Sequence, residues 1–281
     1  MTVIAMTREL GTLGNEVAAG LAREQGLQLV THETVERLAR KTPLHASAVL
    51  RCIEGKPTLL ERWRADLAGL LVYAAEEILD LAAAGDVVIR GWGATHLLRR
   101  VPHVLCVRVC APLEVRASRV MQLFGFDDIA LARNEVQRRD AVREAAMRRR
   151  FGPCWEQSAR YDLVLNTEHI GVGRCVARIR QALESAEFQP TLESRARLRA
   201  LALAAKARSA LWRHPETAKF PIVVEADLNG HPGHIEIRGF VAHETQRRHA
   251  EDVVAGVDGV RAISNNVRAM WPRFALKFHH S

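Results

Sequence analysis

The stretch "MTRELGTLGNEVAAGLA", from Met6 to Ala22, decides the fold of the first part of the chain. It follows a short apolar segment, Thr2–Ala5, that predicts a β-strand, and it runs into a pattern that predicts an amphipathic helix. A loop containing Gly11 and Gly14 joins the two. A strand, a glycine loop and a helix N-terminus together suit the binding of a phosphate group. The stretch therefore raises two questions: whether this chain binds a nucleotide, and whether it transfers phosphate.

The loop lacks the lysine of a standard P-loop, which bridges the β- and γ-phosphates. No lysine follows Gly14, and the nearest cation is Arg8. Leu13 stands where glycine would be easier, because a bulky residue resists positive φ. Taken alone, the loop fits either a tight turn or a phosphate site. The candidate phosphate-binding residues are Arg8, Gly11, Thr12, Gly14 and Asn15.

Apolar runs alternate with helical patterns through the first two thirds of the chain. The runs contain much Val, Leu and Ile with little alternation, as strands buried on both faces do. We therefore predict an α/β fold with a parallel sheet covered by helices. The expected strands are residues 2–5, 27–30, 86–91, 103–111 and 161–167, with a long helix at 58–84.

The composition changes after about Ala186, where a basic amphipathic helix, residues 192–212, begins a different pattern. Two strands around a turn rich in Gly, His and Pro follow, then a helix and a third strand. Ile235 and Ile237 alternate with polar residues, which is typical of a half-exposed antiparallel strand. We expect two domains, residues 1–189 and 190–281, the second a small α+β module.

Composition and charge limit the function classes. The 281 residues are 48% hydrophobic and carry a net charge of +8, so the chain forms real cores and attracts anions, including nucleotides, nucleic acids and anionic lipids. No apolar run reaches the ~18–20 residues of a membrane-spanning helix. The N-terminus also lacks the layout of a signal peptide. We expect a cytoplasmic protein.

The five cysteines form no CxxC pair and no metal-ligand spacing. Cys106 and Cys110 lie in an apolar strand and are interpreted as small buried hydrophobic residues. His231 and His234 flank a Pro-Gly turn, and two more histidines lie near the C-terminus. We interpret these four histidines as solvated and assign no metal site.

The order of segments over Met1–Glu187 resembles the cytidylate kinase-like family, a branch of the nucleoside monophosphate kinases. The glycine loop resembles the family's S-R-E-F-G-S-G-G-R pattern. "DVVIRGWGATHLLRRVPHVLCVRVCAPLEVRASRV" resembles its third strand, G-R-G-A turn and fourth strand, "RRDAVREAAMRRRFG" its lid, and "YDLVLNTEHIGVGRCVARI" its last strand and closing helix. The resemblance implies ATP as phosphate donor, a nucleoside monophosphate as acceptor, and Mg²⁺.

The lid resemblance implies roles for Arg139 and Arg143, since the family's lid arginines close over the transferring phosphate. The two are four residues apart, so a helix places them on one face. Asp140 lies beside them and could hold one guanidinium in place. An arginine fork suits a phosphoryl group that carries charge on three oxygens. Arg148–Arg150 point in different directions and fit a solvated helix better.

The expected acceptor site is the turn Gly91-Trp92-Gly93, after the third strand. Ligands of open α/β folds bind at this edge of the sheet. The family usually has arginine at the position of Trp92. Tryptophan can stack on a base or pack internally, but it cannot pair with a phosphate. His32 similarly replaces an aspartate of the family pattern, so the acceptor base stays open.

The C-terminal module, near Thr191–Trp271, resembles a BON domain in "GHIEIRGFVAHETQRRHAEDVVAGVDGVRAISNNV". This resemblance implies attachment to phospholipid or to a partner. The basic helix within it, Arg195–Arg208, has two readings: it lies on an anionic membrane, or its apolar stripe packs on the module's own sheet. The second reading is the simpler.

Two functions remain. The first is a phosphotransferase that moves phosphate from ATP to a nucleoside monophosphate. The alternative is a nucleotide sensor without turnover, whose BON-like domain contacts anionic lipid or a protein. Binding of nucleic acid has only net charge in its favour, and the oligomeric state stays open.

Overall fold

The computed structural model describes residues 1–30, 41, 48–49, 67–91, 93–151, 158–228 and 231–270. The chain divides into two compact units, Met1–Arg195 (unit 1) and Ala196–Ser281 (unit 2). The division falls inside helix α10 (Leu192–Arg213), a few residues beyond the position expected from composition.

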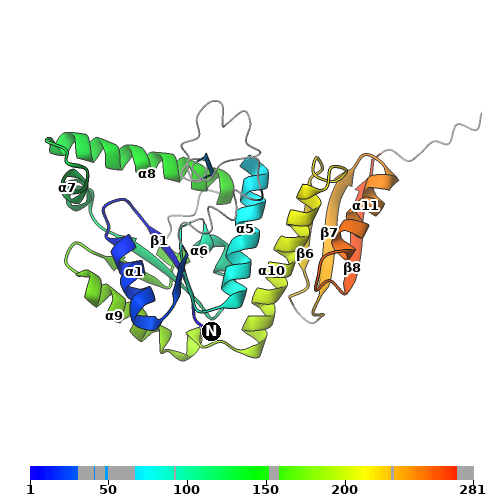
Figure 1. The fold of residues 1–281 in the computed structure, drawn as a ribbon, viewed down its shortest axis with the longest axis horizontal. Coiled ribbons are helices and arrows are strands. Elements are labelled where there is room, and N and C mark those ends of the chain that lie inside the picture. Colours follow the sequence, from blue (N-terminus) through cyan, green and yellow to red (C-terminus); the bar gives the residue numbers. More distant parts are fainter. Residues whose placement is uncertain are drawn as a thin grey trace, which may run out of the picture. The chain divides into compact units, whose positions relative to one another are not determined.

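Unit 1 contains a five-stranded sheet with the order β2-β3-β1-β4-β5 (Figure 1). Every pair of neighbouring strands is parallel, which confirms the predicted α/β fold with a parallel sheet. In this register Val3 lies opposite Val87 on one side and Val104 on the other. The strands are β1 (Val3–Arg8), β2 (Gln28–Val30), β3 (Val87–Arg90), β4 (Val104–Cys110) and β5 (Leu163–Asn166).

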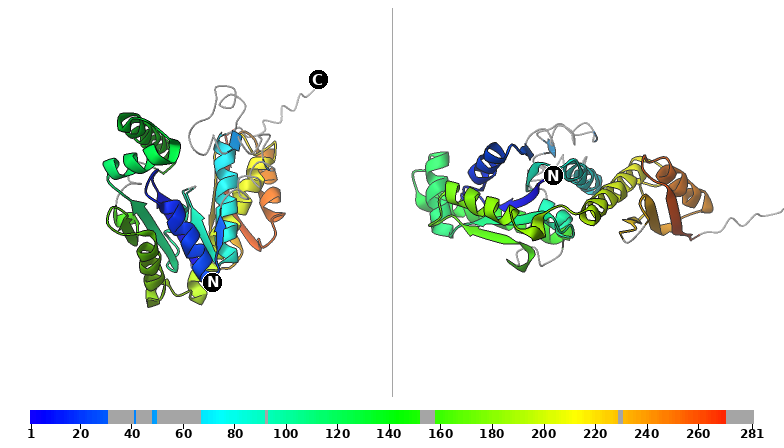
Figure 2. Two further views of the ribbon diagram at one scale, coloured as in Figure 1. Left: turned by 60° about the vertical axis from the view of Figure 1, so that its left-hand side comes forward. Right: turned by 90° about the horizontal axis from the view of Figure 1, so that it is seen from below.

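Helices cover both faces of the sheet, with α1 and α9 on one face and α5 and α6 on the other (Figures 1 and 2). The helix expected at 58–84 is described from Leu67 onward, and its earlier residues lie outside the described part. The helices of unit 1 before α10 are α1 (Gly14–Gln25), α5 (Leu67–Ala84), α6 (Ala94–Leu98), α7 (Leu113–Phe124), α8 (Ile129–Phe151) and α9 (Val172–Leu183), with 3₁₀ turns at Ser158–Arg160 and Ala186–Phe188.

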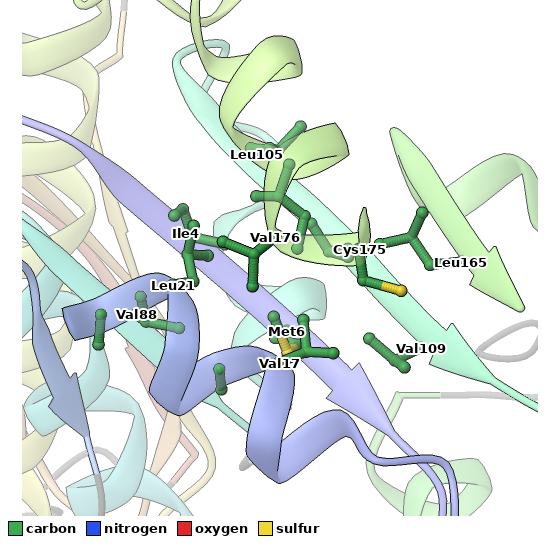
Figure 3. Packing of buried hydrophobic residues seen from close by; sticks show 14 residues of the cluster. Ile4, Met6, Val17, Leu21, Val88, Leu105, Val109, Leu165, Cys175 and Val176 are labelled. Atoms are coloured by element: carbon green, nitrogen blue, oxygen red, sulfur yellow. The ribbon is translucent and has the colours of Figure 1, made fainter. Parts of the chain in front are cut away.

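The core under α1 and α9 is drawn in Figure 3. Ile4 and Met6 on β1 are fully buried against Leu21 of α1 and Val176 of α9. Burial of one such aliphatic side chain contributes roughly 1.5–3 kcal/mol. Because residues on the opposite face of β1, such as Ala5, are buried too, the strand lacks polar alternation. The glycine loop follows this central strand directly and therefore lies at the carboxyl edge of the sheet.

The start of α10 is capped and joined to the body of unit 1. The Thr191 amide donates to Ser194 Oγ and the Ser194 amide donates to Thr191 Oγ1, both at 3.0 Å. The hydroxyl of Ser194 also lies 2.8 Å from His103 Nδ1 in a buried hydrogen bond. Burial, with the nearby charges of Arg195 and the N-terminal amine, lowers the pKa of His103. The ring is therefore held as a neutral interior group.

Unit 2 has a three-stranded sheet with the order β6-β7-β8. β6 and β7 pair antiparallel, as the alternation of Ile235 and Ile237 predicts, whereas β7 and β8 pair parallel. The buried side of α10, including Ala207 and Leu211, packs on this sheet, which confirms the simpler reading of the basic helix. The elements are β6 (Ile222–Ala226), β7 (His234–Val241), α11 (Glu244–Ala255) and β8 (Ala262–Ala269).

Across the described ranges, every helix is too short or too polar to cross a lipid bilayer.

Candidate nucleotide-binding site

The glycine loop lies at the carboxyl edge of the sheet of unit 1. β1 ends at Arg8 and α1 begins at Gly14, so the loop occupies residues 9–13. The chain leaves β1 toward β2 on one side of the sheet, and it leaves β4 toward β5 on the other. Neighbouring strands whose connections diverge in this way form the crevice in which α/β folds bind ligands.

The backbone of the loop needs residues without a side chain. Gly11 has φ +78°, and a Cβ there would lie 2.7 Å from the carbonyl oxygen of Arg116. A Cβ on Gly14 would lie 2.5 Å from Cβ of Arg8. Leu13 has φ +58° and ψ +19°, a left-handed conformation that glycine adopts more easily. The loop thus has the glycine geometry of a phosphate loop, with a leucine in a strained position before the helix.

Side chains from two distant segments hold the loop. Thr12 is fully buried, and its hydroxyl donates to the Glu9 carbonyl at 2.8 Å. The Thr167 hydroxyl donates to the Thr12 carbonyl at 2.8 Å, and Arg119 of α7 donates to the Gly11 carbonyl at 3.1 Å. Arg119 also donates to the Thr167 carbonyl at 2.7 Å. Sequence reasoning missed Thr167 and Arg119, because their role follows only from the three-dimensional contact.

An ion-pair cluster lies beside the loop around Glu9. Arg108 of β4 donates to Glu9 Oε1 at 2.6 Å, and Arg116 of α7 and Arg143 of α8 have nitrogens 3.7 and 3.9 Å from the same carboxylate. Asp140 accepts from Arg116 at 2.7 Å and lies 3.6 Å from Arg143. Three arginines thus face two carboxylates, which leaves an excess of positive charge at the loop.

The two lid arginines have different positions. Arg143 donates from Nη1 to the backbone carbonyl of Arg8, so it reaches the loop itself. Arg139 donates instead to Glu135 Oε1 on its own helix, and its guanidinium lies 5.3 Å from the centre of the Phe124 ring. Asp140 holds one lid guanidinium as expected, that of Arg143. The structure therefore brings Arg143 to the loop and places Arg139 against α7.

Burial and partners act on these cations in opposite directions. Burial lowers the pKa of the Arg143 guanidinium, against the opposing effect of Glu9 and Asp140. Burial is also the largest effect on Arg108, but the hydrogen bond and the charge of Glu9, with Tyr161 and Cys110, together outweigh burial and raise the pKa of this guanidinium. Both groups remain charged at neutral pH because arginine starts near 12.5. An arginine that has lost its hydrating water is stabilised by an anion that accepts its hydrogen bonds in place of that water.

On the expected acceptor side, Gly91 and Gly93 have φ +81° and +75° and form the turn between β3 and α6. Trp92 and the segment that contains His32 lie outside the described residues. The structure brings a further cation here, since Arg90 donates from Nη1 to Asn15 Oδ1 at the start of α1. Burial lowers the pKa of Arg90, and its Nε is buried with no hydrogen-bond partner.

A shallow hollow adjoins this turn. His96 Nδ1 lies 3.4 Å from Arg160 Nη1 at its rim, and burial together with Arg160 lowers the pKa of His96. The hollow is therefore lined by one neutral imidazole and by cationic guanidinium groups. The lining residues are Thr95, His96, Arg99, Met147, Arg160 and Tyr161.

The described residues at the loop fit a polyphosphate better than they fit a metal ion. Mg²⁺ prefers carboxylate and water oxygens. The two carboxylates nearest the loop, Glu9 and Asp140, are engaged by arginines, and the Thr12 hydroxyl is fully buried and donates to a carbonyl. We therefore assign no protein ligand to Mg²⁺.

A central β-strand, a glycine loop, a helix N-terminus and converging arginines define a nucleotide-binding, kinase-like α/β fold. The chain belongs to the cytidylate kinase-like family, whose model matches residues 3–169, more than half of the sequence.

A solved structure that aligns with a TM-score above 0.5 agrees on the fold. An uncharacterized protein from Eubacterium ventriosum ATCC 27560 aligns with a TM-score of 0.53 and 20% identity over 66% of this chain and 99% of its own. A shikimate kinase from Bacteroides thetaiotaomicron aligns with a TM-score of 0.42 and 16% identity over 66% of this chain and 99% of its own. The search of curated proteins found no match.

Proposed function

We propose that unit 1 is a phosphotransferase that takes the γ-phosphoryl group of ATP and gives it to a nucleoside monophosphate. An oxygen of the acceptor's phosphate forms a bond to the γ-phosphorus, and the bond from that phosphorus to the β,γ-bridging oxygen breaks. The products are ADP and a nucleoside diphosphate. The observation that carries the proposal is the contact of Arg143, from the lid helix, with the Arg8 carbonyl at the glycine loop.

The main-chain amides around Gly11–Gly14 and the N-terminus of α1 hold the donor phosphates in this proposal. The arginines facing Glu9 and Asp140 exchange carboxylate partners for phosphate oxygens when the nucleotide binds. Hydrogen bonds to charged groups contribute roughly 1.5–3 kcal/mol each, so two of them offset the missing lysine in ground-state binding. Mg²⁺ bound with ATP would supply charge neutralisation at the phosphates, and the described residues would provide no ligand to it.

Arg143 is the lid residue placed to neutralise the transferring group. Arg139 joins it only if the guanidinium leaves Glu135 and Phe124. Gly91, Trp92 and Gly93 form the acceptor turn in this proposal. Arg90, next to the turn, supplies the positive charge that tryptophan cannot give to the acceptor phosphate.

A second candidate, a nucleotide sensor without turnover, is favoured by the loop's own sequence. Leu13 crowds the loop from a left-handed conformation, and Asn15 accepts from Arg90 at the helix start, where the family pattern has arginine. These two side chains replace groups that approach the phosphates in the family's pattern. A loop with these side chains is better suited to binding ATP than to accelerating phosphoryl transfer.

Calorimetric titration with ATP and Mg²⁺ and a coupled ADP-release assay with a panel of monophosphates separate the candidates. Heat on binding with turnover on one acceptor supports the enzyme. Heat without turnover on any acceptor supports the sensor. If ATP and Mg²⁺ produce neither heat of binding nor a rise in the thermal midpoint, both proposals are wrong.

The BON-like character of unit 2 is a separate proposal. The strand, helix and strand of the resemblance are present as β7, α11 and β8. Val223 and Phe240 are exposed on the sheet beside Arg238, whose guanidinium pairs with Glu225 and Glu236, so the two apolar side chains are the groups on this face that would contact a lipid surface. Flotation of the full chain with vesicles containing phosphatidylglycerol tests it, and equal recovery of the wild-type chain and Phe240→Ala counts against it.

A further inference from the structure

A cluster of three potential metal ligands lies at the end of the β6–β7 hairpin in unit 2. The turn His231-Pro232-Gly233-His234 is closed by a hydrogen bond from the His234 amide to the His231 carbonyl at 3.0 Å. Gly233 has φ +86°, as the third position of a type II turn requires, and proline suits the second position. The turn thus fixes two histidines at its ends.

Asp227 completes the group from the opposite strand. Its amide donates to the His234 carbonyl at 3.2 Å, which sets the two residues across the hairpin. Its Oδ2 lies 2.9 Å from His231 Nδ1 and 3.9 Å from His234 Nδ1. One ligand atom of each of the three residues lies within 4.8 Å of the other two.

These separations suit a small tetrahedral ion. Metal–ligand bonds of about 2.0–2.1 Å in a tetrahedron place neighbouring ligand atoms roughly 3.3–3.4 Å apart. The two distances from Asp227 lie on either side of that value, so small side-chain movements would bring the ligand atoms to the separations of such an ion. The side chain of His231 is 83% exposed, which gives an ion access.

His234 has the second contact that a metal-binding histidine needs. Its Nε2 lies 2.8 Å from Ser264 Oγ on β8. A donor hydrogen bond from Nε2–H to that hydroxyl leaves the lone pair on Nδ1, the atom that faces Asp227. Such outer contacts fix the tautomer and the orientation of the ring.

We propose that Asp227, His231 and His234 bind a divalent transition-metal ion, with Zn²⁺ as the best match, and that water completes the coordination. Two imidazoles and one carboxylate are a donor set that suits Zn²⁺, whereas Mg²⁺ and Ca²⁺ prefer oxygen alone. The sequence suggested solvated histidines here, because Asp227 reaches them only across the hairpin. The site lies outside unit 1, so it is independent of nucleotide chemistry.

The test uses the full chain and Co²⁺ as a spectroscopic substitute for Zn²⁺. We expect visible d–d absorption of a four-coordinate site, which Zn²⁺ removes by competition, and a Zn²⁺-dependent rise in thermal midpoint. His231→Ala should remove the absorption with an unchanged circular dichroism spectrum, because its side chain is exposed. Ser264→Ala should weaken Zn²⁺ affinity by roughly 10–100-fold, as changes to outer contacts do.

Two controls separate this site from incidental histidines. His169→Ala removes a histidine with equally high exposure that lies 3.5 Å from Glu168, and it should leave the Co²⁺ spectrum unchanged. A variant with alanine at His279 and His280 removes the C-terminal pair and should bind one Co²⁺ as before. Octahedral absorption alone, loss of binding in the His279/His280 variant, or full binding by His231→Ala would overturn the proposal.

Discussion

Arg143 of α8 and Arg8 of β1 are 135 residues apart in the chain, yet the guanidinium of one donates to the backbone carbonyl of the other. The contact joins the lid helix to the end of the central strand. It puts a positive charge at the entrance of the glycine loop, where phosphate oxygens would accept the same donors.

Replacement of Arg143 by alanine should therefore weaken ATP binding or turnover by roughly ten- to hundredfold. One charge-assisted hydrogen bond contributes about 1.5–3 kcal/mol, and each 1.4 kcal/mol is a factor of ten. Calorimetry gives the effect on affinity, and the coupled assay gives the effect on kcat. Arg139→Ala is the matched control, since that arginine pairs with Glu135, and it should change either quantity by less than about threefold. Equal losses of ATP affinity or kcat in Arg143→Ala and Arg139→Ala would show that the lid acts only through its total positive charge.

The strain at Leu13 predicts a difference between two small replacements. Leu13→Gly and Leu13→Ala both remove the isopropyl group, but only alanine keeps a Cβ at φ +58°. The free energy of unfolding of Leu13→Gly should exceed that of Leu13→Ala by about 1 kcal/mol, which is the lower end of the cost of a left-handed residue. Urea denaturation measures the difference. If crowding by Leu13 limits the loop, Leu13→Gly also binds ATP more tightly than wild type, and unchanged affinity would argue against crowding.

Gly11 and Gly26 give a matched pair of glycines with positive φ. Alanine at Gly26 meets nothing within 4 Å, so its cost is conformational alone, about 1–2 kcal/mol. Alanine at Gly11 adds a contact of 2.7 Å with the Arg116 carbonyl and should cost more. Denaturation curves give both values. The same cost in both variants would mean that the loop shifts freely away from α7.

The Cys106 thiol predicts a dependence of stability on alkaline pH. Burial, with the Asp162 carboxylate, raises its pKa from 9.0 to about 12. The unfolded chain loses this proton at the lower pH, so the stabilising contribution is complete below pH 9 and is lost between pH 9 and 12. The slope is about 1.4 kcal/mol per pH unit. Cys106→Ala should show a shallower fall in unfolding free energy from pH 9 to 10.5, and parallel curves would contradict the prediction.

The sheet of unit 1 could be predicted because its central strands β1, β3 and β4 are largely buried on both faces. A segment such as Val104–Cys110 is apolar except for Arg108, and its spacing from other such segments leaves room for crossover helices. In unit 2 the alternation of Ile235 and Ile237 showed which side chains are buried. The antiparallel pairing that we expected holds for β6 and β7 but not for β7 and β8, because side chains alternate with a period of two in both arrangements and alternation does not fix strand direction.

Residues of the candidate site could be predicted from the sequence only where they lie close together in the chain. The glycine loop is one continuous segment, so its residues could be named from spacing. The contact of Arg90 with Asn15 and the support of the loop by Thr167 and Arg119 join segments far apart in sequence. A helix pattern places Arg139 and Arg143 on related faces, but the neighbours of that helix decide which one meets the loop.

The hydrogen bond between His103 and Ser194 has a practical consequence for dissecting the chain. A recombinant fragment cut where the composition changes, at Gln189, would lack Ser194 and would strand an imidazole nitrogen in the interior. The same fragment extended past Arg195 keeps the hydroxyl that satisfies it. Poor solubility of the shorter fragment would then result from the position of the cut. It would not show whether unit 1 folds on its own.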